Sequence, residues 1–70
     1  MKPSNDILRE LRTKAGKTQD YMAQAIDMNA SEYNRLESGK RKIQIKHILK
    51  IAKAVEKPIA EVLLNMNGLN

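Results

Sequence analysis

Apolar residues recur at three- and four-residue spacings along most of the 70-residue chain, and no stretch alternates with the two-residue period of a strand. In the first part of the chain, Leu8, Leu11 and Ala15 fall on one helical face. Gly16 follows them as a suitable C-cap. This pattern predicts a first helix over about residues 6–15.

Two short helices with good N-terminal caps follow the first. Thr18 is a suitable N-cap for a second helix over about residues 19–26. Asn29 is a suitable N-cap for a third helix over about residues 30–38, and Glu32 stands three positions later, as in a capping box. The second and third helices are therefore expected to be joined by only about three residues.

The second half of the chain is also helical in pattern. The apolar residues that mark the expected inner face of a fourth helix are Ile45, Ile48, Leu49, Ala52 and Val55. Pro58 fits the first turn of a fifth helix that ends near Asn65. We expect an all-α fold, a compact five-helix bundle, in one domain over residues 1–70, with its core over about 6–65 and a frayed tail over 66–70.

The short turn Asp27–Asn29 forces the third helix to cross the second steeply, as in a helix-turn-helix unit. At about 100° per residue, Tyr33 and Leu36 face inward on the third helix. Small or hydrogen-bonding residues face outward: Ala30, Ser31, Asn34, Arg35 and Ser38. Asn can bond an adenine edge, Arg a guanine edge, and Ala can contact a thymine methyl group. An ordinary amphipathic helix with a solvated outer face is the alternative that this helix alone leaves open.

The charge of the chain adds to this picture. Thirteen Lys and Arg face eight Asp and Glu, which gives a formal charge of +5 and indicates a polyanionic partner. Tyr21 and Tyr33 are the only aromatic residues, too few for a base-stacking platform, so duplex DNA is favoured over a single strand. Several residues flank the outward face and are candidates for contacts to the DNA backbone: Gln19, Asn29, Lys40, Arg41, Lys42 and Lys46.

Other function classes have little support. There is no Cys and a single His, His47, so we expect no metal site and place His47 on the surface or the side of a helix. No nucleophile, base and orienting group can be assembled, so we expect no enzyme activity, and no cofactor or small-molecule ligand. The chain has neither a 20-residue apolar run nor a signal-peptide pattern, which predicts a cytoplasmic protein with no membrane partner.

The chain resembles a known family, the Cro/C1-type (Xre, lambda-repressor-like) helix-turn-helix family. The resemblance covers about residues 7–64. It is carried by the runs Leu8-Arg9-Glu10-Leu11-Arg12, Gly16-Lys17-Thr18-Gln19, Tyr33-Asn34-Arg35-Leu36-Glu37-Ser38-Gly39 and Ile51-Ala52-Lys53-Ala54-Val55, with Ala23, Ile26, Val62 and Leu63 at matching spacing. It implies a five-helix domain that binds operator DNA, usually as a dimer, in a transcription regulator that is repressor-like.

The resemblance also implies roles for single residues. The phosphate-clamping Gln of the family matches Gln19, and a structural Arg–Glu pair matches Arg12 and Glu37. The family's base-reading positions match Ala30, Ser31, Asn34 and Arg35. The chain departs from the family at four positions. Asp27 and Glu56 replace common Gly residues, Ile43 replaces a common Pro, and Ala30 stands where a Gln or Ser often reads a base. Asp tolerates the left-handed conformation better than most residues, so we expect the turn to survive.

Partners beyond DNA are the remaining question. The C-terminal part of the chain has more apolar residues than a small core can bury, which suggests a homodimer, formed in solution or only on DNA. The residues of the expected interface are Val62, Leu63, Leu64, Met66 and Leu69. The main alternative function is a protein-interaction module on the same fold, such as an antitoxin-like or polymerase-contacting partner. A basic amphipathic protein at anionic membranes is a weaker alternative.

Overall fold

The structure is a computed structural model that describes residues 3–66. Every regular element in this range is a helix, which confirms the predicted all-α fold. The five helices are α1 (Ser4–Lys14), α2 (Gln19–Ala25), α3 (Ala30–Glu37), α4 (Ile45–Ala54) and α5 (Ile59–Asn65). None of the helices in the described part of the chain is long and apolar enough to cross a membrane.

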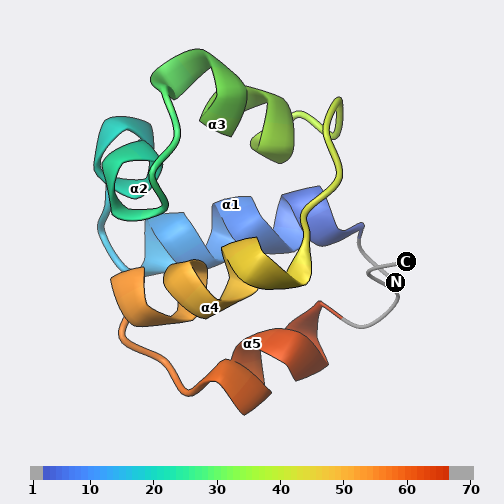
Figure 1. Ribbon diagram of the computed structural model, residues 1–70. Helices are drawn as coiled ribbons and strands as arrows, with labels where there is room; N and C mark the ends of the chain where they lie inside the picture. The colour runs from blue at the N-terminus through green and yellow to red at the C-terminus, as the bar shows by residue number, and fades with distance from the viewer. Residues whose placement is uncertain (1–2, 67–70) are drawn as a thin grey trace.

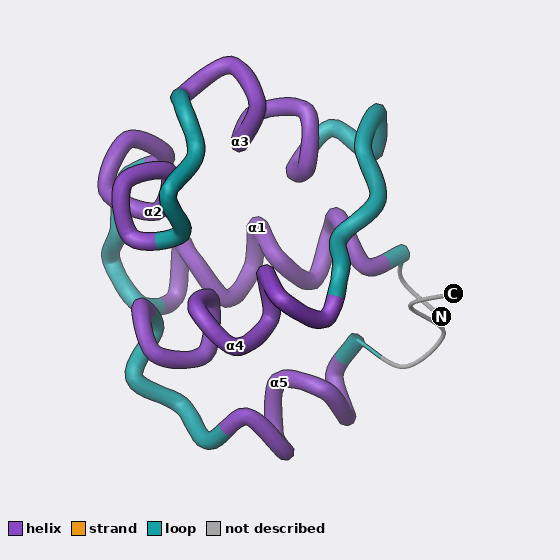
Figure 2. Tube along the Cα trace, in the orientation of Figure 1, coloured by secondary structure: helices purple, strands orange, loops and turns teal. Residues whose placement is uncertain are grey.

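The helices are arranged so that α3 and α5 lie at opposite ends of the molecule, with α1 and α4 between them (Figure 1). Helices α2 and α3 pack against each other, α3 also packs on α1, α2 packs on α4, and α4 packs on α5. The connection from α2 to α3 is short, whereas the connection from α3 to α4 runs along one side of the molecule (Figure 2). As a result, α3 is supported from within and its outer side is left uncovered.

The predicted N-caps of α2 and α3 are present. The Thr18 hydroxyl accepts a hydrogen bond from the backbone N–H of Tyr21 at 3.0 Å, and the Asn29 side chain accepts one from the N–H of Glu32 at 2.8 Å. Each bond satisfies one of the backbone donors that a helix leaves unpaired at its start. Helix α1 begins at Ser4, two residues earlier than its apolar pattern suggests.

Two non-glycine residues adopt the left-handed conformation. Asp27, in the α2–α3 turn, has φ +59°, and Glu56, after α4, also has φ +59°. These are the positions where the family commonly has Gly, so the backbone keeps the geometry that Gly would favour. The expectation that Asp27 tolerates this conformation is confirmed.

One cluster of apolar side chains forms the core. Its members are Leu8, Leu11, Met22, Ala23, Ile26, Tyr33, Leu36, Ile43, Ile48, Ile51, Ala52, Ala54, Val55, Val62 and Met66. The expected inner face of α4 is wrong in part, because Ile45 and Leu49 are 59% and 57% exposed. Ile48, Ala52 and Val55 are buried as predicted. The contacts of α4 with α2 and α5 turn an adjoining side of the helix inward, so that His47, Ile51 and Ala54 are buried in place of Ile45 and Leu49.

Two further predictions need correction. His47 is not a surface residue, since only 5% of it is exposed. Met66, which was expected to begin a frayed tail, is 1% exposed and follows α5 directly. The apolar side chain of Met66 joins the core cluster, so the ordered packing extends one residue beyond the predicted boundary. The rest of the predicted tail, residues 67–70, lies outside the described residues.

Candidate nucleic-acid interface

Helix α3 has one buried side and one exposed side. Tyr33, Leu36 and Glu37 are buried. The five residues predicted to face outward are all exposed: Ala30, Ser31, Asn34, Arg35 and Ser38. None of these five side chains is a bulky apolar group that would resist entering a DNA groove. The exposed side of α3 therefore has the chemistry needed to read base edges.

A buried carboxylate ties α3 to α1. Glu37 is 1% exposed, and its Oε2 lies 2.6 Å from Nε of Arg12, while its Oε1 accepts from Nη2 of the same guanidinium at 3.2 Å. The Tyr33 hydroxyl, on the same helix, donates to Oε2 of Glu37. The predicted ion pair between Arg12 and Glu37 is present, and it is bidentate, which fixes the orientation of both groups.

The charge state of Glu37 follows from its surroundings. Burial favours the neutral carboxyl, but the hydrogen bonds from Arg12, Tyr33 and Gln19 outweigh burial and lower the pKa of Glu37. The pKa of Arg12 is raised, mainly by its hydrogen bond to Glu37. Burial and the bond to Glu37 raise the pKa of Tyr33. Glu37 is thus a carboxylate at neutral pH, and Tyr33 is a neutral donor to it.

Gln19 connects this buried network to the exposed side of α3. Its Nε2 donates to Oε1 of Glu37 at 3.0 Å, and its Oε1 accepts from Nδ2 of Asn34 at a long 3.5 Å. The side-chain oxygen of Asn34, Oδ1, has no hydrogen-bond partner among the described residues. The structure therefore brings together Gln19, Asn34 and Glu37, a connection that the sequence did not reveal, because the three residues lie on two helices.

Two residues near the start of α1 support the end of α3. Asn5 Nδ2 and Arg9 Nη2 donate to the backbone carbonyl of Glu37 at 3.2 and 3.1 Å. Carbonyl groups in the last turn of a helix lack intrahelical partners, so these side chains satisfy one of them. Asn5 and Arg9 are one turn apart on the same helix, and this spacing is the only sequence signal that could have suggested a shared role.

The basic residues after α3 differ in how free they are. Lys40, Lys42 and Lys46 are exposed. Arg41 is about one-third exposed and donates through Nη1 to the Glu32 carboxylate at 2.7 Å. The side-chain oxygen Oδ1 of Asn29 accepts from the Ser31 hydroxyl at 2.9 Å and from the backbone N–H of Glu32. Asn29 and Ser31 are therefore joined by a hydrogen bond.

His47 is the residue of this region that sequence reasoning misplaced. Its Nδ1 accepts from the backbone N–H of Gln44 at 3.0 Å, so the imidazole satisfies a donor at the start of α4. Burial and the nearby charges of Arg41, Lys46 and Lys50 lower its pKa. The signal that could have revealed this role is its position three residues after the N-cap, where a capping box places a side chain that accepts from the N-cap backbone.

Comparison with known proteins agrees with this geometry. A model of the helix-turn-helix family matches residues 8–62. The chain therefore belongs to the helix-turn-helix family, a class of DNA-binding transcription regulators. Among solved structures, it is similar to the clp gene regulator ClgR from C. glutamicum, with a TM-score of 0.79 and 23% sequence identity over 93% of this chain and 84% of that one. No curated protein sequence gives a match.

Proposed function

We propose that this protein is a sequence-specific regulator that binds double-stranded DNA, reads the major groove with α3 and acts as a repressor. The observation that carries the proposal is the exposed side of α3, where five small or hydrogen-bonding side chains stand clear of the core. The fold shared with the C. glutamicum regulator of clp genes supports the same role. In this proposal, the domain represses transcription by occupying promoter DNA that the polymerase needs.

Specificity is assigned to the middle of α3. Arg35 is exposed and its side chain can bond a guanine edge with two parallel hydrogen bonds. Asn34 has a free carbonyl oxygen and one remaining N–H, the pair of groups that an adenine edge requires. Ala30, Ser31 and Ser38 lie on the same side and complete the contact. In this proposal, α3 needs no rearrangement of its buried side to enter the groove.

Affinity is assigned to the flanks of α3. In this proposal, Gln19 and Asn29, at the N-terminal ends of α2 and α3, contact the DNA backbone on one flank, and the exposed cations Lys40, Lys42 and Lys46 contact it on the other. Arg41 adds a cation whose position is set by its ion pair with Glu32. Phosphate contacts on both flanks would fix the register of α3 without contributing sequence information.

The two assignments can be tested with two variants. DNA fragments bound by the protein are first enriched from genomic DNA, and the best duplex is then titrated at several salt concentrations. Removing a bidentate contact to guanine costs about 1–3 kcal/mol, so we expect Arg35→Ala to weaken binding to that duplex but not to a scrambled one. Arg41→Ala is expected to weaken both and to reduce the salt slope by about one unit per protein chain.

Lys53→Ala is the matched control for these variants. Lys53 is an exposed cation near the end of α4, outside the assigned contacts, so both affinities should stay close to those of the unmodified protein. Equal losses for specific and scrambled DNA in Arg35→Ala would contradict base reading. A protein that binds no duplex even at low salt would favour the protein-interaction module instead.

We also propose that the protein pairs with a second copy, because one recognition helix buries little surface on DNA. The dimer interface predicted from the sequence needs correction. Val62 and Met66 belong to the core, and Leu69 lies outside the described residues. The exposed apolar side chains on the packed helices α4 and α5 are Ile45, Leu49, Leu63 and Leu64. Sedimentation with a palindromic duplex is expected to show two chains per duplex, and Leu64→Glu, at a 76% exposed site, is expected to reduce this to one.

A further inference from the structure

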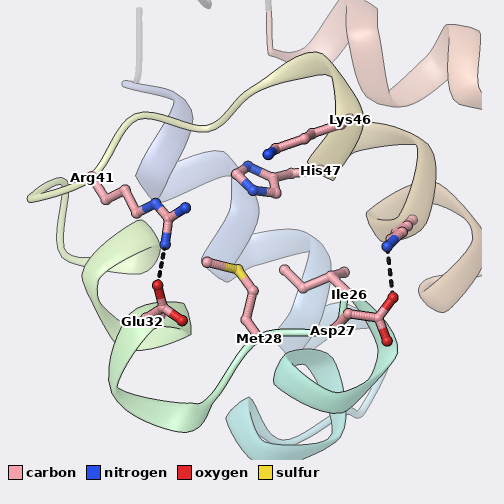
Figure 3. Close-up of a pocket in the computed structure, with 8 residues that line it drawn as sticks. Ile26, Asp27, Met28, Glu32, Arg41, Lys46 and His47 are labelled. Atoms are coloured by element: carbon pink, nitrogen blue, oxygen red, sulfur yellow. Dashed lines mark hydrogen bonds and ion pairs between the residues drawn. The ribbon is translucent and has the colours of Figure 1, made fainter.

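A pocket of about 210 Å³ lies between the α2–α3 turn and α4 (Figure 3). Ile26 and Met28 from the turn form an apolar wall, and the imidazole of His47 and the side chain of Lys46 lie across from them. Ile26 is buried and Met28 is partly buried against the core. One wall of the pocket is therefore apolar and the facing wall is polar.

Most charges around the pocket are already neutralised. The Asp27 carboxylate lies 2.6 Å from Nζ of Lys50, and the Glu32 carboxylate lies 2.7 Å from Nη1 of Arg41. Figure 3 shows these two ion pairs on opposite sides of the pocket. Lys46 has no carboxylate partner among the described residues. The pocket thus carries one uncompensated positive charge.

His47 supplies a second hydrogen-bond donor. Because its Nδ1 accepts from the backbone of Gln44, the proton of the neutral ring is on Nε2. Only 5% of the residue is exposed, and Nε2, which has no partner within residues 3–66, is not closed off in the core but opens on the pocket that His47 lines. Nε2–H therefore reaches solvent in the free protein, and a ligand oxygen in the pocket can replace water as its acceptor.

We infer that this pocket binds a small organic monocarboxylate with a short apolar body. One carboxylate oxygen accepts from the ammonium group of Lys46 and the other from Nε2–H of His47, while the apolar body packs against Ile26 and Met28. The single free charge matches a monoanion better than a phosphate dianion, and a phosphate has no apolar part to cover the apolar wall. This binding does not depend on whether the protein binds DNA.

A link to DNA binding follows if the proposed function is correct. Lys46 is assigned to the DNA backbone, and a bound carboxylate would neutralise that charge. The ligand would also lie beside Arg41, which lines the same pocket. Occupancy of the pocket is therefore expected to weaken DNA binding, and this effect is measured separately from ligand binding itself.

The binding test uses the free protein and nuclear magnetic resonance. His47 is the only His in the chain, so its ring signals are resolved without assignment of other residues. Sodium 3-methylbutanoate is titrated at constant ionic strength near neutral pH. We expect a saturable shift of the His47 ring signals, with weaker binding of acetate, which lacks the apolar body. Inorganic phosphate and 3-methylbutan-1-ol are expected to cause no saturable shift.

Variants locate the contact. Loss of a charged hydrogen bond costs about 1.5–3 kcal/mol, so Lys46→Met should weaken 3-methylbutanoate binding by about tenfold or more. Lys53→Met, an exposed lysine on the same helix but outside the pocket, should leave it unchanged. His47→Leu is followed through the backbone amide of Met28 and should also weaken binding, with the unfolding midpoint showing that the variant is folded.

Three results would overturn the inference. A shift that rises linearly without saturation would mean that no site exists. Equal binding by Lys46→Met and the unmodified protein would mean that the carboxylate lies elsewhere. Phosphate binding as tight as that of 3-methylbutanoate would mean that the pocket takes inorganic oxyanions. Each of these results leaves the DNA-binding proposal intact, since none of the measurements involves DNA.

Discussion

The two buried polar residues in the described part of the chain, Glu37 and His47, differ in how completely they are bonded. The Glu37 carboxylate accepts hydrogen bonds from three side chains, those of Arg12, Gln19 and Tyr33. His47 has one bonded nitrogen, Nδ1, and its Nε2 faces a pocket without a partner in residues 3–66. The fully bonded residue lies on the buried side of α3, and the half-bonded one lies near the start of α4, beside the pocket.

The difference shows two uses of a buried polar group. A network in which every member is bonded becomes rigid, because any movement would leave a group unpaired in a low-dielectric interior. The Glu37 network therefore holds α3 at a fixed angle to α1. A donor that opens on a pocket bonds to water in the free protein, and a ligand can replace that water. The Glu37 network fixes how two helices pack, whereas His47 leaves one ring nitrogen accessible at a pocket.

The largest effect is expected from Glu37→Ala. Removing one partner of a buried ion pair strands the charge of the other, which typically costs about 3–5 kcal/mol. This is a large share of the roughly 5–15 kcal/mol that stabilises a small domain. Urea unfolding followed by circular dichroism should show a strongly lowered midpoint or no folded baseline. Arg12→Ala should behave similarly, and an unchanged midpoint for either variant would contradict the structural role of the pair.

A medium effect is expected from the pH dependence of His47. Its pKa is lower in the folded protein than its ordinary value of 6.5, so the unfolded chain takes up a proton first as the pH falls. Stability should decline as the pH drops below about 6.5, by at most about 1.4 kcal/mol per pH unit, and level off below the folded pKa. The contribution of Glu37, whose folded pKa lies below its ordinary 4.5, is lost only at lower pH.

His47→Gln separates these two windows. In this variant the free energy of unfolding should no longer decline as the pH falls below about 6.5, but it should still decline below about pH 4.5. Urea unfolding across the pH range measures both effects. If the unmodified protein and the variant lost the same stability between these two pH values, His47 would not be the group responsible.

The smallest effect is expected from Glu32→Gln. The Glu32–Arg41 pair is partly exposed, with side chains 46% and 34% accessible, in contrast to the buried Arg12–Glu37 pair. Exposed ion pairs contribute only about 0.2–1 kcal/mol. The urea midpoint should therefore shift slightly, and less in high salt. A loss as large as that of Glu37→Ala would remove the distinction between the two regions.

Much of the fold could be predicted because it depends on neighbours in the chain. Thr18 and Asn29 cap the helices that follow them, since their side chains reach the first backbone donors from an adjacent position. The outward side of α3 was also predictable, because Tyr33 and Leu36 are its only large apolar residues and must face the core. The Arg12–Glu37 pair was expected only through the family resemblance.

Helix α4 shows where the sequence is insufficient. Apolar residues cover more than half of its circumference, so several faces could point inward with similar burial. The expected inner face differs from the observed one by a rotation of roughly 80° at 100° per residue. The contacts with α2 and α5 decide between these faces, and the choice buries His47 and exposes Ile45 and Leu49.

Local sequence is enough to predict five helices, the N-caps of α2 and α3 and a polar outer face on α3, because capping and hydrophobic periodicity act over a few residues. Three features could not be predicted in this way: the side of α4 that is buried, the link that Gln19 makes between Glu37 and Asn34, and the pocket that Lys46 and His47 share with the α2–α3 turn. These features join side chains from different helices. Their distances depend on how whole helices pack, and a one-dimensional pattern does not contain that information.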